Sequence, residues 1–559
     1  MQSPWANWRC DRAASAALCD AMRRMRSCRL CRRRGCGLMA GWLTVHDASG
    51  RGLSVPVVSG RTLAQVVYVS GEWEAPALCS GVGRCGLCRM RFLSQPPQAL
   101  DEEVRLLGQD AVDDGWRLGC RHLAVEGIEV EIPARPRVRA ANGRGHEAGE
   151  PLCLAVDLGT TSVHWSALRG GQRVASGVFL NPQMGAGSEI MSRLAFARSA
   201  SGAEAMRRLV VERLQECIAQ LPSPVARIAL AGNPAMTSLL LERPSDGLCA
   251  APYCLSHLEG EIVRVAPGVP PAYVFPHIGP FIGGDITAGM AWLLSADTPP
   301  EYPFLFADMG TNGEFLLALS PTEFLAASVP LGPALEGVGL DCGTVAAPGA
   351  VTSFALTPRG LQPRRLGAGT TRGISGTGYL SLLSQLRSSG MMDAGGQFSP
   401  GATPLARSLA RGLHTVDGEA RLDLGEGLYL SASDVEEVLK VKAAFNLAFA
   451  RLLRGAGRRA HELAGIYLAG ALGEHVPPRA LETLGFLPPG ASARVTMAGN
   501  TALAGAERQC ADIVLRETAR DVSTRAKVLE LAEDAQFSAQ YLACMTFDHV
   551  TLHTDNSGL

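Results

Sequence analysis

The chain has 559 residues, enough for three or more domains with sizeable cores. Its net charge of −1 gives no indication of binding to nucleic acid or to an anionic membrane, and its 47% hydrophobic and 19% charged residues are ordinary for a globular enzyme. No apolar run approaches the ~18 residues that span a bilayer, so we expect a cytoplasmic protein that uses neither a membrane nor a nucleic acid as partner.

The N-terminal residues 1–39 differ from the rest of the chain because they are basic and rich in cysteine. Cys28 and Cys31 have the spacing of half a zinc site, but no second pair completes it. No apolar core follows the arginines, which excludes a signal peptide. We expect a disordered extension, or coding sequence upstream of a start at Met39.

Residues 40–134 are predicted to form a small α/β domain, and residues 135–150, rich in Arg, Gly, Pro and Ala, a linker. Alternating apolar residues predict strands, and helical spacing predicts helices. The expected strands are 42–46, 53–58, 87–93 and 127–132, and the expected helices are 63–69 and 100–107.

Four cysteines in this domain predict an iron–sulfur site: Cys79, Cys85, Cys88 and Cys120. The intervening glycines allow the tight turns that wrap a cluster. Plant-type ferredoxins place four residues between the first two ligands. Here there are five, followed by two, which matches the adrenodoxin-like variant of a [2Fe–2S] site. A chance cysteine cluster and a zinc knuckle are the alternatives, although zinc usually takes two Cys-x-x-Cys pairs.

The remaining cysteines lie mostly in apolar segments, so buried and inert thiols are expected. Disulfides are not expected in a chain of this length without an export signal. These cysteines are Cys153, Cys217, Cys249, Cys254, Cys342, Cys510 and Cys544.

Residues 151–300 and 301–559 are predicted to be two homologous halves. Each begins with a buried strand, 152–156 or 304–307, followed by an Asp-x-Gly-Thr turn and then a hairpin. The two copies are separated by 151 positions. This repeat predicts two halves that face one another.

The two turns are predicted to bind the phosphates of ATP, because a Gly-Thr turn at a strand end offers backbone N–H groups and a hydroxyl. A strand-terminal aspartate can hold Mg²⁺ or orient a water. Ordinary tight turns are the alternative. The expected phosphate residues are Gly159, Thr160, Thr161, Gly310, Thr311 and Asn312, and the expected catalytic residues are Asp157 and Asp308.

Further glycines are candidates for the same nucleotide. Gly470 and Gly473 follow a buried strand at 466–469, and Gly376 and Gly378 precede a helical segment. Turns that allow close helix packing are the alternative for both pairs. The Gly283-Gly-Asp285 segment is predicted either to line the cleft or to cap a helix at 286–294.

Three later helices are also expected. A capping box at Ser433–Glu436 predicts a long helix that ends near Gly455. The other two are predicted at 501–516 and 526–533.

These motifs resemble the acetate and sugar kinase, Hsp70 and actin superfamily. Together with the cysteine domain, residues 40–550 resemble the reductive activators of corrinoid proteins. Supporting matches are Trp116-Arg-Leu-Gly-Cys120, Asn181-Pro-Gln, Gly332-Pro-Ala-Leu-Glu-Gly, Tyr467-Leu-Ala-Gly and Gly499-Asn. The sequence departs from the family pattern at Ser375, where a cysteine is expected, and at Ala471, where a glycine is expected.

The resemblance implies a β-grasp ferredoxin-like α+β domain followed by a duplicated α/β core of the actin, Hsp70 and sugar kinase type (RNase H-like), which acts as an ATPase. It implies a [2Fe–2S] cluster, ATP and Mg²⁺ as cofactors. The implied activity is ATP-dependent, one-electron reduction of inactive Co(II) to Co(I) in the corrinoid protein of a methyltransferase system. A low-potential electron donor of unknown identity is implied too, and the family often forms homodimers.

Other functions use the same motifs. A small-molecule kinase with an appended ferredoxin domain would need a general base, for which Asp285 and Glu314 are the candidates. A non-catalytic ATP-gated module of the Hsp70 kind would not need four cysteines. A ferredoxin reductase is disfavoured because no Gly-x-Gly-x-x-Gly follows a strand near the cysteines.

Overall fold

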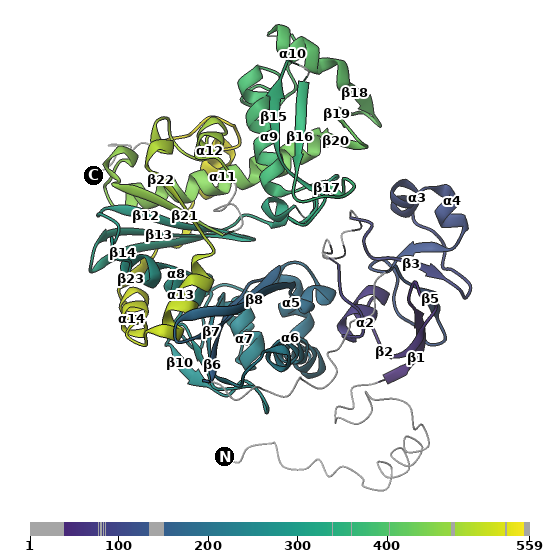
Figure 1. Ribbon diagram of the computed structural model, residues 1–559. Coiled ribbons are helices and arrows are strands. Elements are labelled where there is room, and N and C mark those ends of the chain that lie inside the picture. Colours follow the sequence, from purple (N-terminus) through teal and green to yellow (C-terminus); the bar gives the residue numbers. More distant parts are fainter. Residues whose placement is uncertain are drawn as a thin grey trace, which may run out of the picture.

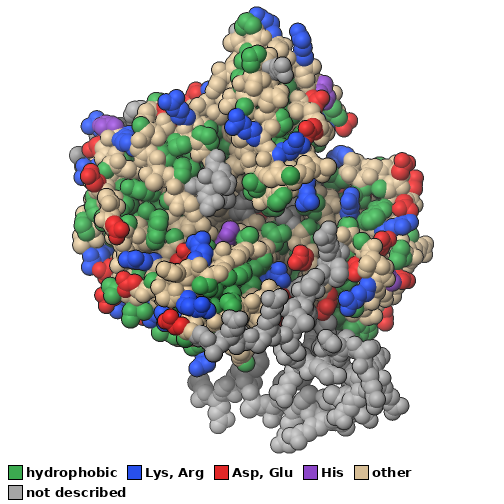
Figure 2. All heavy atoms as spheres, in the orientation of Figure 1, with side chains coloured by type: hydrophobic (Ala, Val, Ile, Leu, Met, Phe, Trp, Pro, Cys, Tyr) green, Lys and Arg blue, Asp and Glu red, His purple; other side chains and the backbone are tan. Residues whose placement is uncertain are grey.

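The computed structural model describes residues 39–133 and 150–552, apart from 77, 79, 80, 82, 84, 338, 359, 402, 471–475 and 532–533. The predictions for residues 1–38 and for most of the linker lie outside the described residues. Figure 1 shows a small N-terminal domain beside two larger halves that are stacked on one another. Basic and acidic side chains are interspersed over the face seen in Figure 2.

The N-terminal domain is built on a five-stranded sheet of order β2-β1-β5-β3-β4. Strand β1 pairs antiparallel with β2 and parallel with β5, and helix α2 packs on the sheet through a common core. This is the expected β-grasp fold. Its elements are β1 (Met39–His46), β2 (Gly52–Val58), α2 (Leu63–Val69), β3 (Arg89–Phe92), α3 (Asp101–Leu107), α4 (Gln109–Asp113), β4 (Trp116–Leu118) and β5 (Glu129–Glu131).

The first half is built on a six-stranded sheet of order β10-β11-β9-β6-β7-β8. Strand β6 is buried along almost its whole length because it lies between β9 and β7. The elements are β6 (Leu152–Leu158), β7 (Ser162–Arg169), β8 (Gln172–Leu180), η2 (Pro182–Ala186), α5 (Ile190–Ala197), α6 (Ala200–Gln220), β9 (Val225–Gly232), α7 (Pro234–Leu241), η3 (Asp246–Leu248), β10 (Glu261–Val263), β11 (Ala272–Val274) and α8 (Gly284–Leu294).

The second half has a matching six-stranded sheet of order β22-β21-β12-β13-β14-β23. The elements of this sheet and its helices are β12 (Phe304–Met309), β13 (Asn312–Ser320), β14 (Glu323–Pro330), η4 (Pro333–Glu336), α11 (Ala432–Gly455), η6 (Ala460–Glu462), β21 (Gly465–Ala469), α12 (Pro478–Thr483), η8 (Ala491–Arg494), β22 (Val495–Gly499), α13 (Thr501–Ala511), α14 (Leu515–Arg525), β23 (Ala526–Val528) and α15 (Phe537–Ala543).

An insertion between β14 and α11 carries two small three-stranded sheets, seen at the top of Figure 1. Its elements are β15 (Ala350–Thr357), β16 (Gly360–Arg365), β17 (Gly373–Ile374), α9 (Gly376–Ser389), α10 (Pro404–Leu409), η5 (Ala410–Gly412), β18 (Leu413–Val416), β19 (Glu419–Gly425) and β20 (Leu428–Ser431).

The predicted internal repeat is confirmed by the sheets. In each half a central strand pairs in parallel with a later strand on one side and with a hairpin on the other: β9-β6-β7-β8 corresponds to β21-β12-β13-β14. A short 3-10 helix follows the hairpin in both copies, η2 in the first half and η4 in the second. The duplicated α/β core is therefore present as expected.

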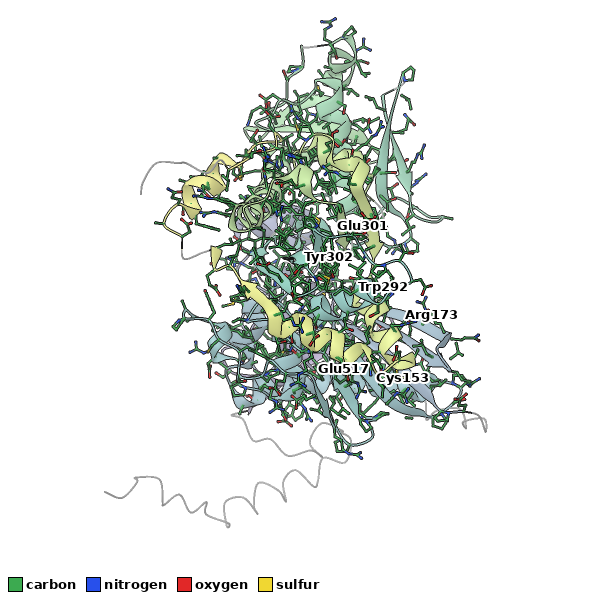
Figure 3. All side chains as sticks on the ribbon, turned by 90° about the vertical axis from the view of Figure 1, so that its left-hand side faces the viewer. Cys153, Arg173, Trp292, Glu301, Tyr302 and Glu517 are labelled. Carbon is green, nitrogen blue, oxygen red and sulfur yellow. A yellow bond between two sulfur atoms is a disulfide. The ribbon has the colours of Figure 1, made fainter. Side chains whose placement is uncertain are left out.

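Two helices join the halves. Helix α8 packs beneath the second sheet, whereas α13 packs on the first sheet through small side chains such as Ala502 and Ala506. In Figure 3 the yellow C-terminal helices cross the boundary between the halves. Among the described residues, no helix combines the length and the apolar character that a bilayer span requires.

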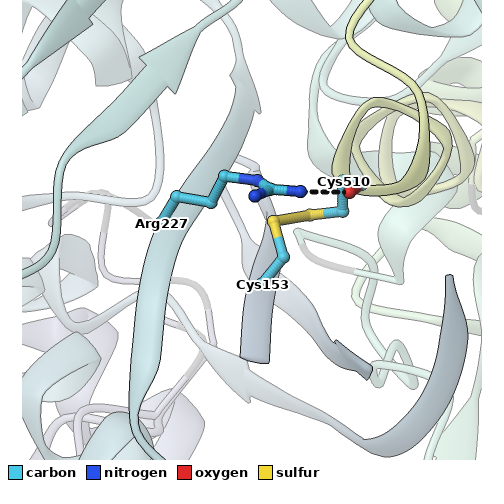
Figure 4. The surroundings of a disulfide bond; sticks show 3 residues. All are labelled: Cys153, Arg227 and Cys510. Atoms are coloured by element: carbon cyan, nitrogen blue, oxygen red, sulfur yellow. Dashed lines mark hydrogen bonds between the residues drawn. A yellow bond between two sulfur atoms is a disulfide. The ribbon is translucent and has the colours of Figure 1, made fainter. Parts of the chain in front are cut away.

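One expectation about the cysteines is wrong. Cys153 in β6 and Cys510 in α13 form a disulfide that links the two halves across 357 positions of sequence (Figures 3 and 4). Arg227 on the neighbouring strand β9 donates a hydrogen bond of 2.7 Å to the Cys510 carbonyl. The sequence could not predict this pairing, because only the packing of α13 on the first sheet brings the two residues together.

Two predicted helix boundaries and one predicted element type are also corrected. The long helix α11 begins earlier than predicted, since the capping box is formed by Ser431 and Asp434. The helix predicted at 501–516 ends at Ala511 and a second helix follows. Residues 526–528 form a strand rather than a helix, because they pair with β14 at the edge of the second sheet.

Candidate functional site

The first candidate site is a cavity of about 220 Å³ that is lined by Cys85, Cys88 and Cys120. Cys88 directly precedes β3 and Cys120 follows β4, and these strands pair with one another. Gly119 N also donates to the Cys88 carbonyl at 3.0 Å, which holds the two segments together. The fourth expected ligand, Cys79, lies outside the described residues.

The donor set suits a two-iron cluster. Each iron of such a cluster takes two thiolates, so the sulfurs are spread around two metal centres, whereas zinc draws four ligands around one point. A hydrogen bond with Cys120, and then burial, raise the pKa of the Cys88 thiol.

The cavity also contains residues that the sequence did not indicate. Met184, Gly185, Ala186 and Gly187, in and just after η2 of the first half, line it together with the three cysteines. The N-terminal domain is therefore docked on the first half at the cysteine cavity. Arg208 supports this contact by donating to the Val69 carbonyl at 3.0 Å.

The second candidate site lies at the two repeated turns. Asp157 is near the end of β6 and Asp308 near the end of β12, and the expected phosphate residues follow each of them. In the first turn, Asn233 Nδ2 donates to Thr160 Oγ1 at 2.9 Å. In the second, Gly310 N donates to the Asn312 carbonyl at 3.0 Å. These bonds fix the conformation of each turn beside its aspartate.

Acidic side chains from both halves shift one another's pKa values near these two turns. Burial raises the pKa of Asp157 to about 6. Burial, and then the charge of Asp157, raise the pKa of Asp285 to about 7. Burial, followed by the charges of Asp285 and Asp308, raises the pKa of Glu314. Buried carboxylates that perturb one another's pKa are typical of a site that holds a divalent cation or moves protons.

Asn500 is a candidate that the sequence analysis named only as part of a motif. Its Nδ2 donates to Asp157 Oδ2 at 2.7 Å, although 343 positions separate the two residues. The same side chain caps α13 by accepting from Leu503 N at 2.8 Å. An asparagine that caps a helix after a strand was the available signal, but its partner in the other half was not predictable.

The Gly283-Gly-Asp285 segment caps a helix, as one of the two alternatives predicted. Gly283 is the N-cap of α8, while Asp285 interacts with the charge of Asp157. His277 fixes the segment by accepting a hydrogen bond of 2.9 Å from Gly284 N at Nδ1. Burial, and then the charge of His257, lower the pKa of His277 to about 3, so the ring is neutral at physiological pH.

The other candidate glycines separate into two groups. Gly470 lies directly against the second turn, since a Cβ placed on it would be 2.5 Å from Asp308 Oδ1. Gly376 and Gly378 instead allow α9 to pack closely, with ideal Cβ positions 1.8 Å from the Leu335 carbonyl oxygen and 2.4 Å from that of Val351. This geometry favours the packing alternative for that pair. Gly473 lies outside the described residues.

The fold and the two sites define the class of protein: a [2Fe–2S] domain joined to an ATPase of the actin, Hsp70 and sugar kinase type. Residues 47–125 match the family model described as a 2Fe-2S iron-sulfur cluster binding domain. Residues 152–294 match the RACo middle region, and residues 303–557 match the C-terminal domain of RACo, the ASKHA domain. The chain belongs to the family of reductive activators of corrinoid proteins.

Individual relatives are distant in sequence. The chain is 25% identical over 422 residues to "Corrinoid activation enzyme RamQ" of Eubacterium limosum, covering 70% of this chain and 69% of that protein. It is 25% identical over 413 residues to "[Co(II) methylated amine-specific corrinoid protein] reductase" of Methanosarcina barkeri, covering 66% and 68%. A solved structure titled "Reductive activator for corrinoid,iron-sulfur protein" has the same fold, with a TM-score of 0.64, 19% identity, and coverage of 92% of this chain and 100% of that one.

Proposed function

We propose that this protein uses ATP to drive the one-electron reduction of Co(II) to Co(I) in a partner corrinoid protein. The observation that carries the proposal is the position of the cysteine cavity, which is walled by the ferredoxin domain on one side and by the first ATPase half on the other. The printed names of the two curated relatives, which concern corrinoid activation and Co(II) corrinoid reduction, support it.

We assign Cys79, Cys85, Cys88 and Cys120 as the cluster ligands. When bound, the cluster would supply one electron; for comparison, plant-type ferredoxins have potentials near −400 mV. A one-electron equilibrium shifts tenfold for each ~59 mV, so a cobalt centre of lower potential is reduced only in a small fraction unless ATP contributes.

The residues of the cleft would supply the ATP-dependent part. The turns at 159–161 and 310–312 bind the phosphates, and Asp157 and Asp308 hold Mg²⁺ and orient the attacking water. Asn500 keeps the Asp157 carboxylate oriented from the opposite half. Because one turn belongs to each half, a nucleotide that contacts both turns favours closure of the cleft.

A redox partner would approach the cluster through a second, larger cavity. It measures about 720 Å³ and borders Cys85, with Trp73 from the ferredoxin domain and Phe179 from β8 among its lining residues. Arg89 and Arg213 also line this cavity, but Glu74 lies in the same lining and pairs with Arg213 at 3.6 Å, so the charge there is mixed. Aromatic side chains beside one ligand suit a carrier with a flat ring.

The direct test is anoxic purification, iron and sulfide analysis, EPR spectroscopy, and spectroscopic measurement of Co(II) reduction in a corrinoid protein from the same genome. We expect two irons and two sulfides per chain, and Co(I) formation that requires hydrolysable ATP. Protein that contains no iron, or that reduces the corrinoid equally well without nucleotide, would contradict the proposal.

A small-molecule kinase remains the second candidate, because Asp285 has the property of a general base. Its pKa of about 7 places its titration near neutral pH, and it interacts with Asp157 in the cleft. A phosphorylation assay with sugars and carboxylates separates the two functions. Transfer of phosphate to one of these substrates faster than to water would favour the kinase.

A further inference from the structure

The segment Asn181–Gly187 lies between the two candidate sites and contacts both of them. We infer that this segment couples the nucleotide to the cluster, with Asn181 as its positioning residue. The inference rests on the proposed function, since it places a nucleotide at the first turn and a cluster at the cysteines. It concerns how the two sites communicate, which neither the family models nor the names of the relatives describe.

At the nucleotide end, Asn181 is tied to the first phosphate turn by two hydrogen bonds. Its Nδ2 donates to the Gly159 carbonyl at 2.8 Å, and its backbone N donates to the Thr161 carbonyl at 2.8 Å. Asn181 is fully buried, so water does not compete for these bonds. Any rearrangement of the turn around a phosphate must therefore move Asn181 or break one of the two bonds.

At the cluster end, the following residues form one wall of the cysteine cavity. Met184 is fully buried within the core of the ferredoxin domain, although it belongs to the first half. Gln65 Nε2 donates to the Ala186 carbonyl at 3.5 Å. Gly185 fits so closely that a Cβ placed on it would be 2.8 Å from Tyr68 Cβ. Movement of this segment would thus change the wall directly.

Between its ends, the segment has little freedom to absorb a movement. It is a single 3-10 helix with Pro182 at its start, and Asn181 Oδ1 caps it by accepting from Gln183 N at 3.0 Å. The buried Arg193 holds the far end by donating from Nε to the Gly187 carbonyl at 2.8 Å. A short helix that is bonded to its neighbours at both ends moves as a rigid unit. A displacement at one site therefore reaches the other.

The internal repeat indicates that the Asn181 side chain is specific to this connection. Gly332 and Pro333 occupy the corresponding positions of the second half, 151 residues later. Gly332 N also donates to its own turn, at 2.8 Å to the carbonyl of Thr311, which corresponds to Thr160, but glycine has no side-chain amide to reach back to that turn. The second half does not need that bond, since its 3-10 helix packs on α9 and α11 rather than on a redox domain.

The property that would respond is the reduction potential of the cluster. Potentials of such clusters depend on solvent exposure and on hydrogen bonds to the sulfurs, and both change when a wall of the cavity moves. If the nucleotide changes the reduction equilibrium of the cluster by some factor, thermodynamic reciprocity requires that nucleotide affinity differs between the oxidised and reduced protein by the same factor. A tenfold difference in affinity corresponds to about 59 mV in potential.

The test compares Asn181→Gly, which recreates the residue of the second half, with Asn233→Gly. Asn233 is the matched control: it also caps a helix and donates to the first turn, through Thr160 Oγ1, but it leads into α7 and not to the cysteines. The midpoint potential and EPR g-values are measured with and without a saturating non-hydrolysable ATP analogue. We expect a nucleotide-dependent shift in wild type and Asn233→Gly, and its loss in Asn181→Gly.

Two further measurements keep the inference falsifiable. Gly185→Ala disturbs the connection from the cluster end, and it should lose the shift while its nucleotide affinity in the oxidised state stays at the wild-type value. In protein without iron, hydrogen exchange of the backbone amides of residues 183–187 should change on nucleotide binding in wild type and not in Asn181→Gly.

The outcomes separate this inference from the proposed function. An equal potential shift in wild type and Asn181→Gly would overturn the inference and leave ATP-dependent cobalt reduction intact. Absence of any nucleotide effect on wild type, in both potential and hydrogen exchange, would also overturn it. Protein without iron would refute the proposed function, and the inference would then be judged by hydrogen exchange alone.

Discussion

Replacing Gly470 with alanine tests whether the end of β21 positions Asp308. Gly470 has a φ of +83°, and an added Cβ would lie 2.5 Å from Asp308 Oδ1 and 2.9 Å from the Met309 carbonyl oxygen. The carboxylate can rotate away from the new methyl group. The Met309 oxygen cannot, because it belongs to strand β12. We therefore expect Gly470→Ala to strain the backbone and to displace Asp308.

A matched control separates the two contributions to the loss of stability, the backbone strain and the overpacking. A residue with a side chain in the left-handed region costs roughly 1–2 kcal/mol, and overpacking adds about 1–3 kcal/mol. Gly490 has a similar φ of +80°, but nothing lies within 4 Å of its Cβ position, so Gly490→Ala bears only the first cost. Gly470→Ala should thus be less stable than Gly490→Ala by about 1–3 kcal/mol. A catalytic group misplaced by about 1 Å loses roughly 100-fold in rate.

The assay is calorimetric unfolding of both variants, combined with steady-state ATP hydrolysis. Iron content serves as an internal control, since the cysteine cavity lies in another part of the molecule. We expect both variants to keep the cluster and only Gly470→Ala to lose hydrolysis. If Gly470→Ala unfolds at the same temperature as Gly490→Ala and hydrolyses ATP at the wild-type rate, Asp308 is not held against this glycine or does not act in the reaction.

Three other changes give separate predictions. Cys85→Ser should abolish the [2Fe–2S] EPR signal and leave nucleotide binding intact, whereas Asp308→Ala should do the reverse; a full cluster spectrum in Cys85→Ser would refute the ligand assignment. Burial lowers the pKa of His277 to about 3, below the ~6.5 of an unfolded histidine, so its contribution to stability is complete above pH 6.5 and is lost as the pH falls towards 3. Through His277, the free energy of unfolding should fall by at most about 1.36 kcal/mol for each pH unit of acidification. This decrease should be smaller in His277→Gln, and melting temperatures compared from pH 7 to 5 check it. Cys510→Ser removes the disulfide between the halves and should cost about 2–5 kcal/mol in unfolding free energy, whereas Cys544→Ser, at a buried cysteine outside the disulfide, should cost much less; equal melting temperatures for the two variants, or absence of the linked peptide in mass spectrometry, would contradict the disulfide.

Local sequence signals were sufficient for the framework of this fold. The apolar runs that become β6 and β12, each ended by Asp-x-Gly-Thr, predicted two halves because a buried central strand needs no partner-specific information to be recognised. Errors arose where local signals competed. Ser433 and Glu436 have the spacing of a capping box, but Asp434 completes one with Ser431, and the helix begins there.

Long-range contacts could not be predicted from local sequence signals. Residues 526–528 have no local reason to be a strand and become one only because they extend the sheet beside β14. The bond from Asn500 to Asp157 and the disulfide of Cys153 both depend on α13 crossing to the first sheet. Sequence reasoning therefore named candidate residues for each site, whereas the partners that contact those residues required the tertiary structure.

The divergence of the two halves after their hairpins explains how a duplicated ATPase core can serve a redox domain. Both copies follow the hairpin with a proline and a 3-10 helix, so the framework itself imposes no difference. In the second half this helix packs within its own half, whereas in the first it inserts Met184 into the ferredoxin core. Asn181 adds the hydrogen bond to the phosphate turn that Gly332 lacks. One repeat unit thus retains a purely structural helix, while the other uses the same helix to connect two chemistries.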